Sequence, residues 1–209
     1  EDEFFFEADL LLGLNYFINK NYPKAQKHFK RLNKTFRYSL SDEDFLSDTL
    51  VVWSEASKGN KKESFDFFNT ISGRYKNLKG IQKGFLQCYF DFPETQATFK
   101  KLINDEEYNF SRYNFFLANY LLFKNRDKEA KKIIANARNT NDSNILIKQA
   151  ENFILTKNTK KIKNLFDCKN PNDVVAEIFY IMANLYSTQK DYEISNFYLK
   201  ISLLLNDKF

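Results

Sequence analysis

Apolar residues recur three and four positions apart along most of the chain, which is the spacing of one side of an α-helix and not of a strand. In the first such stretch Leu12 and Tyr16 lie four residues apart, with Gly13 beside them. After a short polar break, Ala25 and Phe29 repeat the four-residue spacing. Because Gly13 carries no Cβ, a second helix can approach closely at that point. The pattern therefore predicts two helices packed together as a hairpin.

The hairpin pattern recurs six times along the chain. The large apolar residue of each second helix falls at Phe29, Phe68, Phe99, Ile134, Phe166 and Leu199, five steps with a mean spacing of 34 residues. A fixed period of this length indicates an array of helical repeats. Each hairpin leaves one apolar side uncovered, so the next copy has to stack on it. We therefore expect an all-α chain of about six hairpins, at roughly 4–36, 43–73, 78–104, 110–140, 143–168 and 172–206.

The clearest copies resemble the tetratricopeptide repeat (TPR) family, whose pattern is W-x2-L-G-x2-Y…A-x3-F…P. The segments that carry the resemblance are Leu12-Gly13-x-x-Tyr16, Leu117-Ala118-x-x-Leu121 and Met182-Ala183-x-x-Tyr186. It covers nearly all of the 209 residues, although the leading Trp and the trailing Pro are missing. The order of motifs also resembles divergent multi-repeat TPR proteins of alphaproteobacteria. Membership implies a single right-handed α-solenoid, or superhelix, whose concave groove binds a peptide or a partner helix without catalysis.

The TPR resemblance also implies which side chains meet the partner. In the family, first-helix positions one step from the packing residues line the concave groove. In the first copy these positions are Glu7, Leu10, Leu14 and Phe17. The fourth and sixth copies supply the main partner-binding candidates, which are Arg112, Phe115, Asn119, Leu122, Tyr180, Asn184 and Ser187. The Asn side chains are the most informative, because an amide can bond both the N–H and the C=O of an extended peptide.

Composition agrees with a helical scaffold and offers little for catalysis. Hydrophobic residues make up 43% of the chain, enough for a large core, and 5 Gly with 3 Pro leave little room for a loop-rich β fold. The one histidine, His28, is expected to be a solvated helix residue. Cys88 and Cys168 show no metal-ligand spacing and imply no disulfide framework; we expect Cys88 to be buried and Cys168 to be more exposed. No catalytic residue, metal or cofactor is therefore expected.

The charge pattern bears on the choice of partner. The chain has 32 basic and 27 acidic residues, and we interpret its two lysine-rich second helices, at 24–34 and 157–163, as solvent-facing. The alternative function is a helical-repeat RNA-binding protein, which needs recurring polar residues at matching positions. Those positions hold Leu14, Asn119, Glu151 and Asn184, which form no code. We therefore expect a protein or peptide partner and not a nucleic acid.

Compartment and oligomeric state stay open at this stage. No run reaches the 18 or more apolar residues of a transmembrane helix, and both cytoplasmic and periplasmic locations are compatible with the residues present. The sequence opens without Met and at a helix already under way. We therefore expect it to be a fragment of a longer chain.

Overall fold

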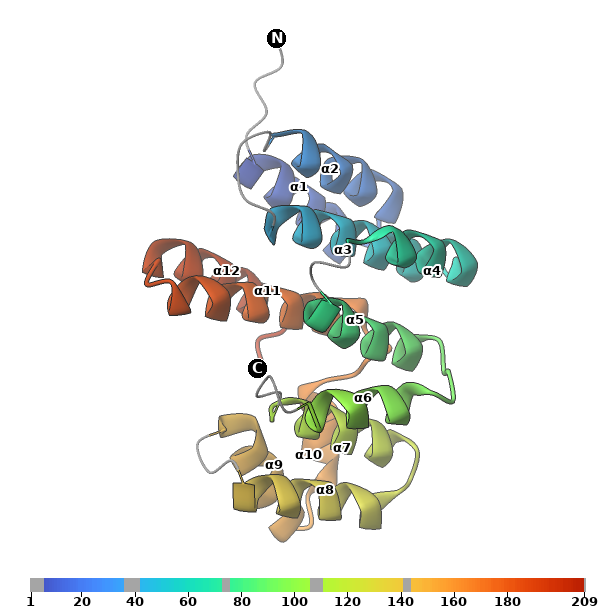
Figure 1. Ribbon diagram of the computed structural model, residues 1–209, viewed down its shortest axis with the longest axis vertical. Coiled ribbons are helices and arrows are strands. Elements are labelled where there is room, and N and C mark those ends of the chain that lie inside the picture. The colour runs from blue at the N-terminus through green and yellow to red at the C-terminus, as the bar shows by residue number, and fades with distance from the viewer. Residues whose placement is uncertain (1–5, 36–41, 73–75, 106–110, 141–143, 209) are drawn as a thin grey trace. The chain divides into compact units, whose positions relative to one another are not determined.

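A computed structural model of the protein describes residues 6–35, 42–72, 76–105, 111–140 and 144–208. Within these ranges the chain is all-helical, with twelve helices and no strand (Figure 1). In chain order the helices are α1 (Phe6–Ile18), α2 (Tyr22–Thr35), α3 (Asp42–Ser57), α4 (Lys61–Thr70), α5 (Lys76–Tyr89), α6 (Thr95–Ile103), α7 (Tyr113–Phe123), α8 (Asp127–Thr140), α9 (Ile145–Leu155), α10 (Thr159–Leu165), α11 (Pro171–Thr188) and α12 (Tyr192–Leu205). The chain divides into two compact units, Glu1–Lys79 and Gly80–Phe209, with the division inside α5.

Two helices fall within the approximate range of each expected copy. The copy boundaries at residues 4, 36, 73, 110 and 143 lie outside the described residues.

The turn inside each hairpin has the same backbone conformation in all six copies. One residue of each turn adopts a positive φ of 55° to 86°, in the left-handed region or close to it. These residues are Lys20, Gly59, Asp91, Asn125, Lys157 and Lys190, five steps from 20 to 190 with a mean of 34. The N–H of the following residue donates to the carbonyl five positions back, as for Asn21 to Tyr16 and Asp191 to Tyr186. This is the Schellman motif that ends many helices. The backbone conformation of the turns therefore repeats along the chain, as the apolar spacing does.

The first unit packs α1 to α4 around the residues that the apolar spacing singled out. Ala25 and Phe29 have no exposed surface, and a Cβ added at Gly13 would lie only 2.5 Å from the Phe29 ring. The close approach expected at Gly13 is thus confirmed. Ser47 of α3 donates a 2.7 Å hydrogen bond to the carbonyl of Phe29, which fastens the second hairpin to the first.

A buried carboxylate ties the turn of the second hairpin to α2. Glu55 of α3 accepts hydrogen bonds from Gln26 of α2, from Lys58 and from Asn60. Burial alone would raise the pKa of Glu55, but these three bonds hold it below its usual value. The folded first unit therefore favours the charged form of Glu55.

The second unit centres on aromatic rings from four places in the chain. Phe85 of α5 packs edge-on against Phe99 of α6 at 5.5 Å between ring centroids. It also meets Phe116 of α7 at 5.0 Å and Phe166 at 5.4 Å. Phe166 directly follows α10 in an extended conformation. It is fully buried, so the connector from α10 to α11 is anchored in the core of this unit.

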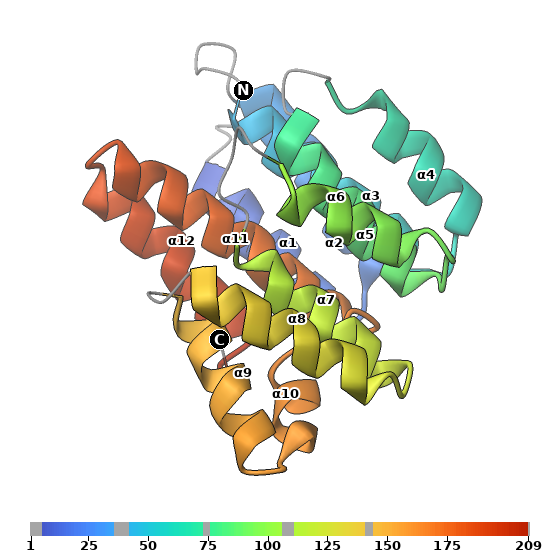
Figure 2. The same ribbon diagram turned by 60° about the horizontal axis from the view of Figure 1, so that its bottom comes forward.

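Two links in this unit join copies that are not adjacent in sequence. A disulfide joins Cys88 in α5 to Cys168, between the third copy and the end of the fifth. Arg112, just before α7, pairs with Glu177 in α11, between the fourth copy and the sixth. A simple helical array is held by contacts between neighbouring repeats. These links therefore add bonds that the repeat pattern alone did not predict. Figure 2 gives a second view of the same helices.

Candidate partner-binding site

Three of the expected partner-binding residues form a row on α11. Tyr180, Asn184 and Ser187 follow one another at four- and three-residue spacing and share one side of the helix. Asn184 and Ser187 are exposed, and Tyr180 is partly exposed. Asn184 donates one N–H to the carbonyl of Tyr180 at 2.8 Å. Since a primary amide has two N–H groups and an acceptor oxygen, this side chain keeps further hydrogen-bonding capacity for a ligand.

Arg112, just before α7, supports Tyr180 in this row. Its guanidinium carbon lies 3.8 Å from the centre of the Tyr180 ring, a cation–π contact. The same group holds Glu177 with two nitrogens, Nε to Oε1 at 2.9 Å and Nη2 to Oε2 at 2.8 Å. The Tyr113 hydroxyl adds a longer bond of 3.4 Å to Glu177. The ring of Tyr180 is thus fixed in orientation by a buried ion pair beneath it.

The ion pair changes the role expected for Arg112. Glu177 has no exposed surface; burial raises the pKa of its carboxyl above the usual value, and the charge of Arg112 opposes that rise. Burial also raises the pKa of the Tyr113 hydroxyl well above its ordinary value. The sequence analysis placed Arg112 among the residues that contact the partner. In the structure its charge is already matched by Glu177, so it positions Tyr180 instead.

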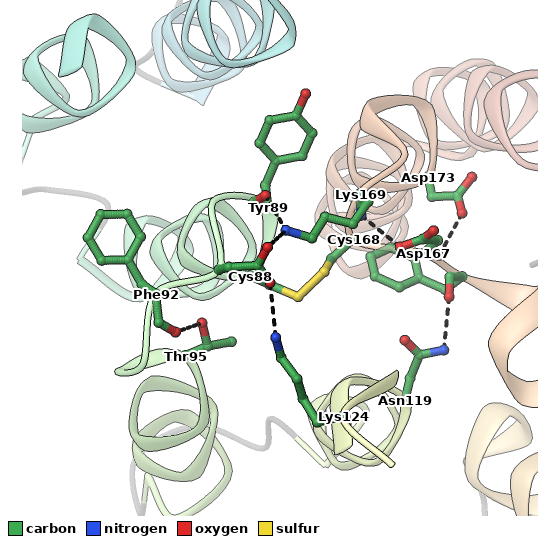
Figure 3. The surroundings of a disulfide bond; sticks show 12 residues. Cys88, Tyr89, Phe92, Thr95, Asn119, Lys124, Asp167, Cys168, Lys169 and Asp173 are labelled. Carbon is green, nitrogen blue, oxygen red and sulfur yellow. Dashed lines mark hydrogen bonds and ion pairs between the residues drawn. A yellow bond between two sulfur atoms is a disulfide. The ribbon is translucent and has the colours of Figure 1, made fainter. Parts of the chain in front are cut away.

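The face of α7 expected to line a groove lies inside the second unit. Phe115 and Leu122 have no exposed surface, and Asn119 is 2% exposed. The Asn119 amide donates to the carbonyl of Ile162 at 3.0 Å and to that of Phe166 at 2.9 Å. Asn119, labelled in Figure 3, therefore holds the end of α10 and its connector.

The same difference is found in the first copy. Leu10, Leu14 and Phe17, expected on the groove side, are at most 1% exposed, whereas Leu12, expected in the packing, is 48% exposed. Glu7, the fourth candidate of this copy, is exposed. The register that places Tyr180, Asn184 and Ser187 on the surface in α11 therefore points mainly into the core in α1 and α7.

The two cysteines form one disulfide bond, a pairing that the expectation of no disulfide framework did not include. Their Cα atoms lie 6.0 Å apart, within the usual range for a bridge, and the chain between them spans 80 residues. Cys88 is buried as expected, but Cys168 is buried too, at 7% exposure. The reason is that the connector folds back onto the C-terminal end of α5, where Cys168 meets Cys88 (Figure 3) and Phe166 packs against Phe85.

Charged side chains surround the disulfide. Asp91 accepts hydrogen bonds from both Lys169 and Lys124, the latter at 3.0 Å. The Lys169 bond is the main reason why the pKa of Asp91 lies below its usual value. A small cavity of about 180 Å³ opens beside the bridge and is lined by both cysteines. Lys169 and Asp91 form an ion pair between the same two segments that the disulfide joins. These segments are therefore linked twice, once by the disulfide and once by the ion pair.

His28 is not the solvated helix residue that the sequence indicated. Its Nδ1 lies 2.8 Å from the Asp9 carboxylate, and its ring stacks on Tyr16 at 5.5 Å between centroids. Asp9 is 5% exposed and is also met by Arg31 at 3.3 Å. The histidine therefore joins α2 to α1.

The lysine-rich second helices do face solvent. Lys24 and Lys30 of α2 and Lys161 of α10 are exposed. Their ammonium groups lie 5.2 to 5.5 Å from the centres of aromatic rings. These contacts give the lysines a packing role on the surface.

Comparison of the chain with protein-family models, with curated proteins and with solved structures found no match. The resemblance to TPR proteins therefore rests on the sequence pattern alone. In the described ranges no cluster of three or more His, Cys, Asp and Glu side chains could bind a metal ion. Nor does any helix there combine the length and the apolar character needed to cross a bilayer.

Proposed function

We propose that the protein is a non-catalytic TPR-like scaffold, a right-handed α-solenoid that binds a peptide or a partner helix. The repeated hairpins with their common turn support the array. The observation that carries the binding proposal is the row of Tyr180, Asn184 and Ser187 on α11, which is polar and accessible and in which Arg112 orients the Tyr180 ring. Such a row can hydrogen-bond a peptide backbone while the Tyr ring supplies apolar contact.

The RNA-binding alternative has less support. A repeat code needs one accessible polar side chain at the matching position of each copy. Of the four positions compared, Leu14 is 1% exposed and Asn119 is 2% exposed, and Asn119 is already bonded to two carbonyls. The structure thus offers no continuous row of base-reading side chains across the described copies.

The disulfide bears on the compartment. Buried disulfides between distant segments persist in oxidising surroundings and are rare in the reducing cytosol. Of the two locations left open by the sequence, we therefore favour the oxidising one, a periplasm-like compartment.

A peptide-display screen followed by titration tests the binding proposal. A peptide selected on the native protein should lose about tenfold in affinity when Asn184 is changed to Ala, because a ligand amide loses its partner. Asn152→Ala is the matched control, since Asn152 is an exposed Asn on α9. Equal affinity of the wild type and Asn184→Ala for every selected peptide would refute the α11 site. Tight, strongly salt-dependent binding of single-stranded RNA, lost when Lys24 and Lys27 are changed to Ala, would favour the alternative.

A further inference from the structure

The outward side of α12 carries a row of apolar residues. Tyr192, Leu199 and Leu203 are 66%, 39% and 43% exposed. With Asn196 they stand at spacings of four, three and four residues. This is the spacing of the contact seam in a two-helix coiled coil. We call these four residues the α12 seam. It lies away from the opposite side of the helix, where Tyr198, Ile201 and Leu205 are buried in the hairpin.

Only one flank of the seam carries charges. Glu193 and Lys200 are both exposed and lie seven residues apart, so they occupy the same position of successive heptads. On the other flank, Ser195 and Ser202 donate hydrogen bonds to carbonyls of α11. That flank is therefore occupied by the hairpin itself. Helices α11 and α12 lie side by side in Figures 1 and 2. A helix that docks on the seam meets Glu193 and Lys200 along its one open edge.

This arrangement is complementary to itself in the antiparallel direction. When two such helices pack antiparallel, residues on the same flank pair across the two-fold axis. Glu193 of one copy then faces Lys200 of the other, and the second such pair forms at the other end. The seam layers put Tyr192 against Leu203 and Asn196 against Leu199. In a parallel pair the charged flank would face the serine flank, and neither ion pair would form.

We propose that the α12 seam is a self-association surface, through which two copies of this chain pair antiparallel as a two-fold dimer. The apolar layers supply the attraction, and the two Glu193–Lys200 pairs select a second copy in this orientation. This inference is independent of the peptide site on α11.

Sedimentation velocity over a concentration series tests the proposal. The native protein should show a concentration-dependent species of twice the chain mass. Leu203→Glu should abolish the dimer, because each of its two chains would then bury one charged Glu side chain among the four layers of the seam. Leu155→Glu makes the same change at an exposed Leu of α9 and should leave the dimer intact. Circular dichroism of both variants checks that the helices persist.

Charge-swapped variants give the sharper test, because they change no apolar contact. Glu193→Lys and Lys200→Glu each place like charges at both ends of the seam, and each should weaken the dimer about tenfold. The double variant, with both changes in one chain, restores opposite charges and should recover native affinity. A mixture of the two single variants should form heterodimers in preference to either homodimer. A monomeric native protein at all concentrations, or a double variant no stronger than the singles, overturns the proposal.

Discussion

Gly13 offers the most direct test of how the hairpins close. A Cβ at this position would lie 2.5 Å from Cε1 and 2.7 Å from Cδ1 of Phe29, and 3.2 Å from the Cβ of His28. Carbon atoms in contact stand about 3.5 Å apart or more, so the ring would have to move by about 1 Å. Phe29 has no exposed surface and therefore cannot swing out without leaving a hole.

Two opposing terms decide the effect of Gly13→Ala. Overpacking of a buried contact costs about 1–3 kcal/mol. Alanine in a helix interior gains about 1 kcal/mol over glycine. Because the clash involves two ring atoms at less than 3.0 Å, we expect the upper part of the overpacking range, a net destabilisation of about 1–2 kcal/mol. Ala8→Gly, at an exposed position of the same helix, measures the propensity term separately.

Urea denaturation followed by the fluorescence of Trp53 is the assay. This is the only Trp of the chain and is fully buried in α3, so its signal reports the first unit. A double-mutant cycle with Phe29→Leu adds a control, because removing ring atoms should make Gly13→Ala less harmful. If Gly13→Ala is as stable as the wild type, or its effect adds independently to that of Phe29→Leu, the close packing inferred at Gly13 is refuted.

Three further predictions concern the second unit. Arg112→Ala should lower the unfolding free energy by about 3–5 kcal/mol, because Glu177 stays buried without its cation. Changing both Arg112 and Glu177 to Met should recover most of this loss. A double variant as unstable as Arg112→Ala would contradict this reasoning. Burial raises the pKa of Asp173 from 3.8 to about 6, so the folded state binds a proton on this carboxyl more tightly than the unfolded state does, and the stability that this gives is lost as pH rises through about 6. Between about pH 4 and pH 6 the urea midpoint of Asp173→Asn should therefore rise relative to that of the wild type. A difference in midpoint that stays constant with pH would count against this prediction. Reduction of the Cys88–Cys168 bridge should lower the unfolding free energy by about 2–5 kcal/mol when unfolding is followed by circular dichroism, while the transition seen in Trp53 fluorescence does not move. The variant with both cysteines changed to Ser should be as stable as the reduced protein and should not respond to reductant.

The apolar spacing of the sequence was sufficient to place the hairpins but not their faces. Gly13, Ala25 and Phe29 have local partners within one hairpin, so the period of 34 residues located them correctly. Helix α7 is different, because nine of its eleven residues are buried. A helix that is apolar on all sides gives no amphipathic direction. The family register therefore could not reveal that Asn119 points inward.

The long-range links had weaker signals. Glu177 stands alone among apolar neighbours in its helix, and a lone carboxylate in such a run indicates a buried cation partner. Nothing local identified that partner as Arg112, 65 positions away. The disulfide gave no signal, because its cysteines lie in different copies and meet only when the connector folds back.

The bridge between Cys88 and Cys168 also determines how the chain would respond to mechanical tension. A force that pulls on the two ends passes through the sulfur–sulfur bond and bypasses the intervening segment, which spans 80 positions. Unravelled, those residues would contribute roughly 270 Å of contour length, at about 3.4 Å per residue. In the oxidised protein that length stays hidden from the load, and α6 to α10 remain unstretched while both ends of the chain are drawn out.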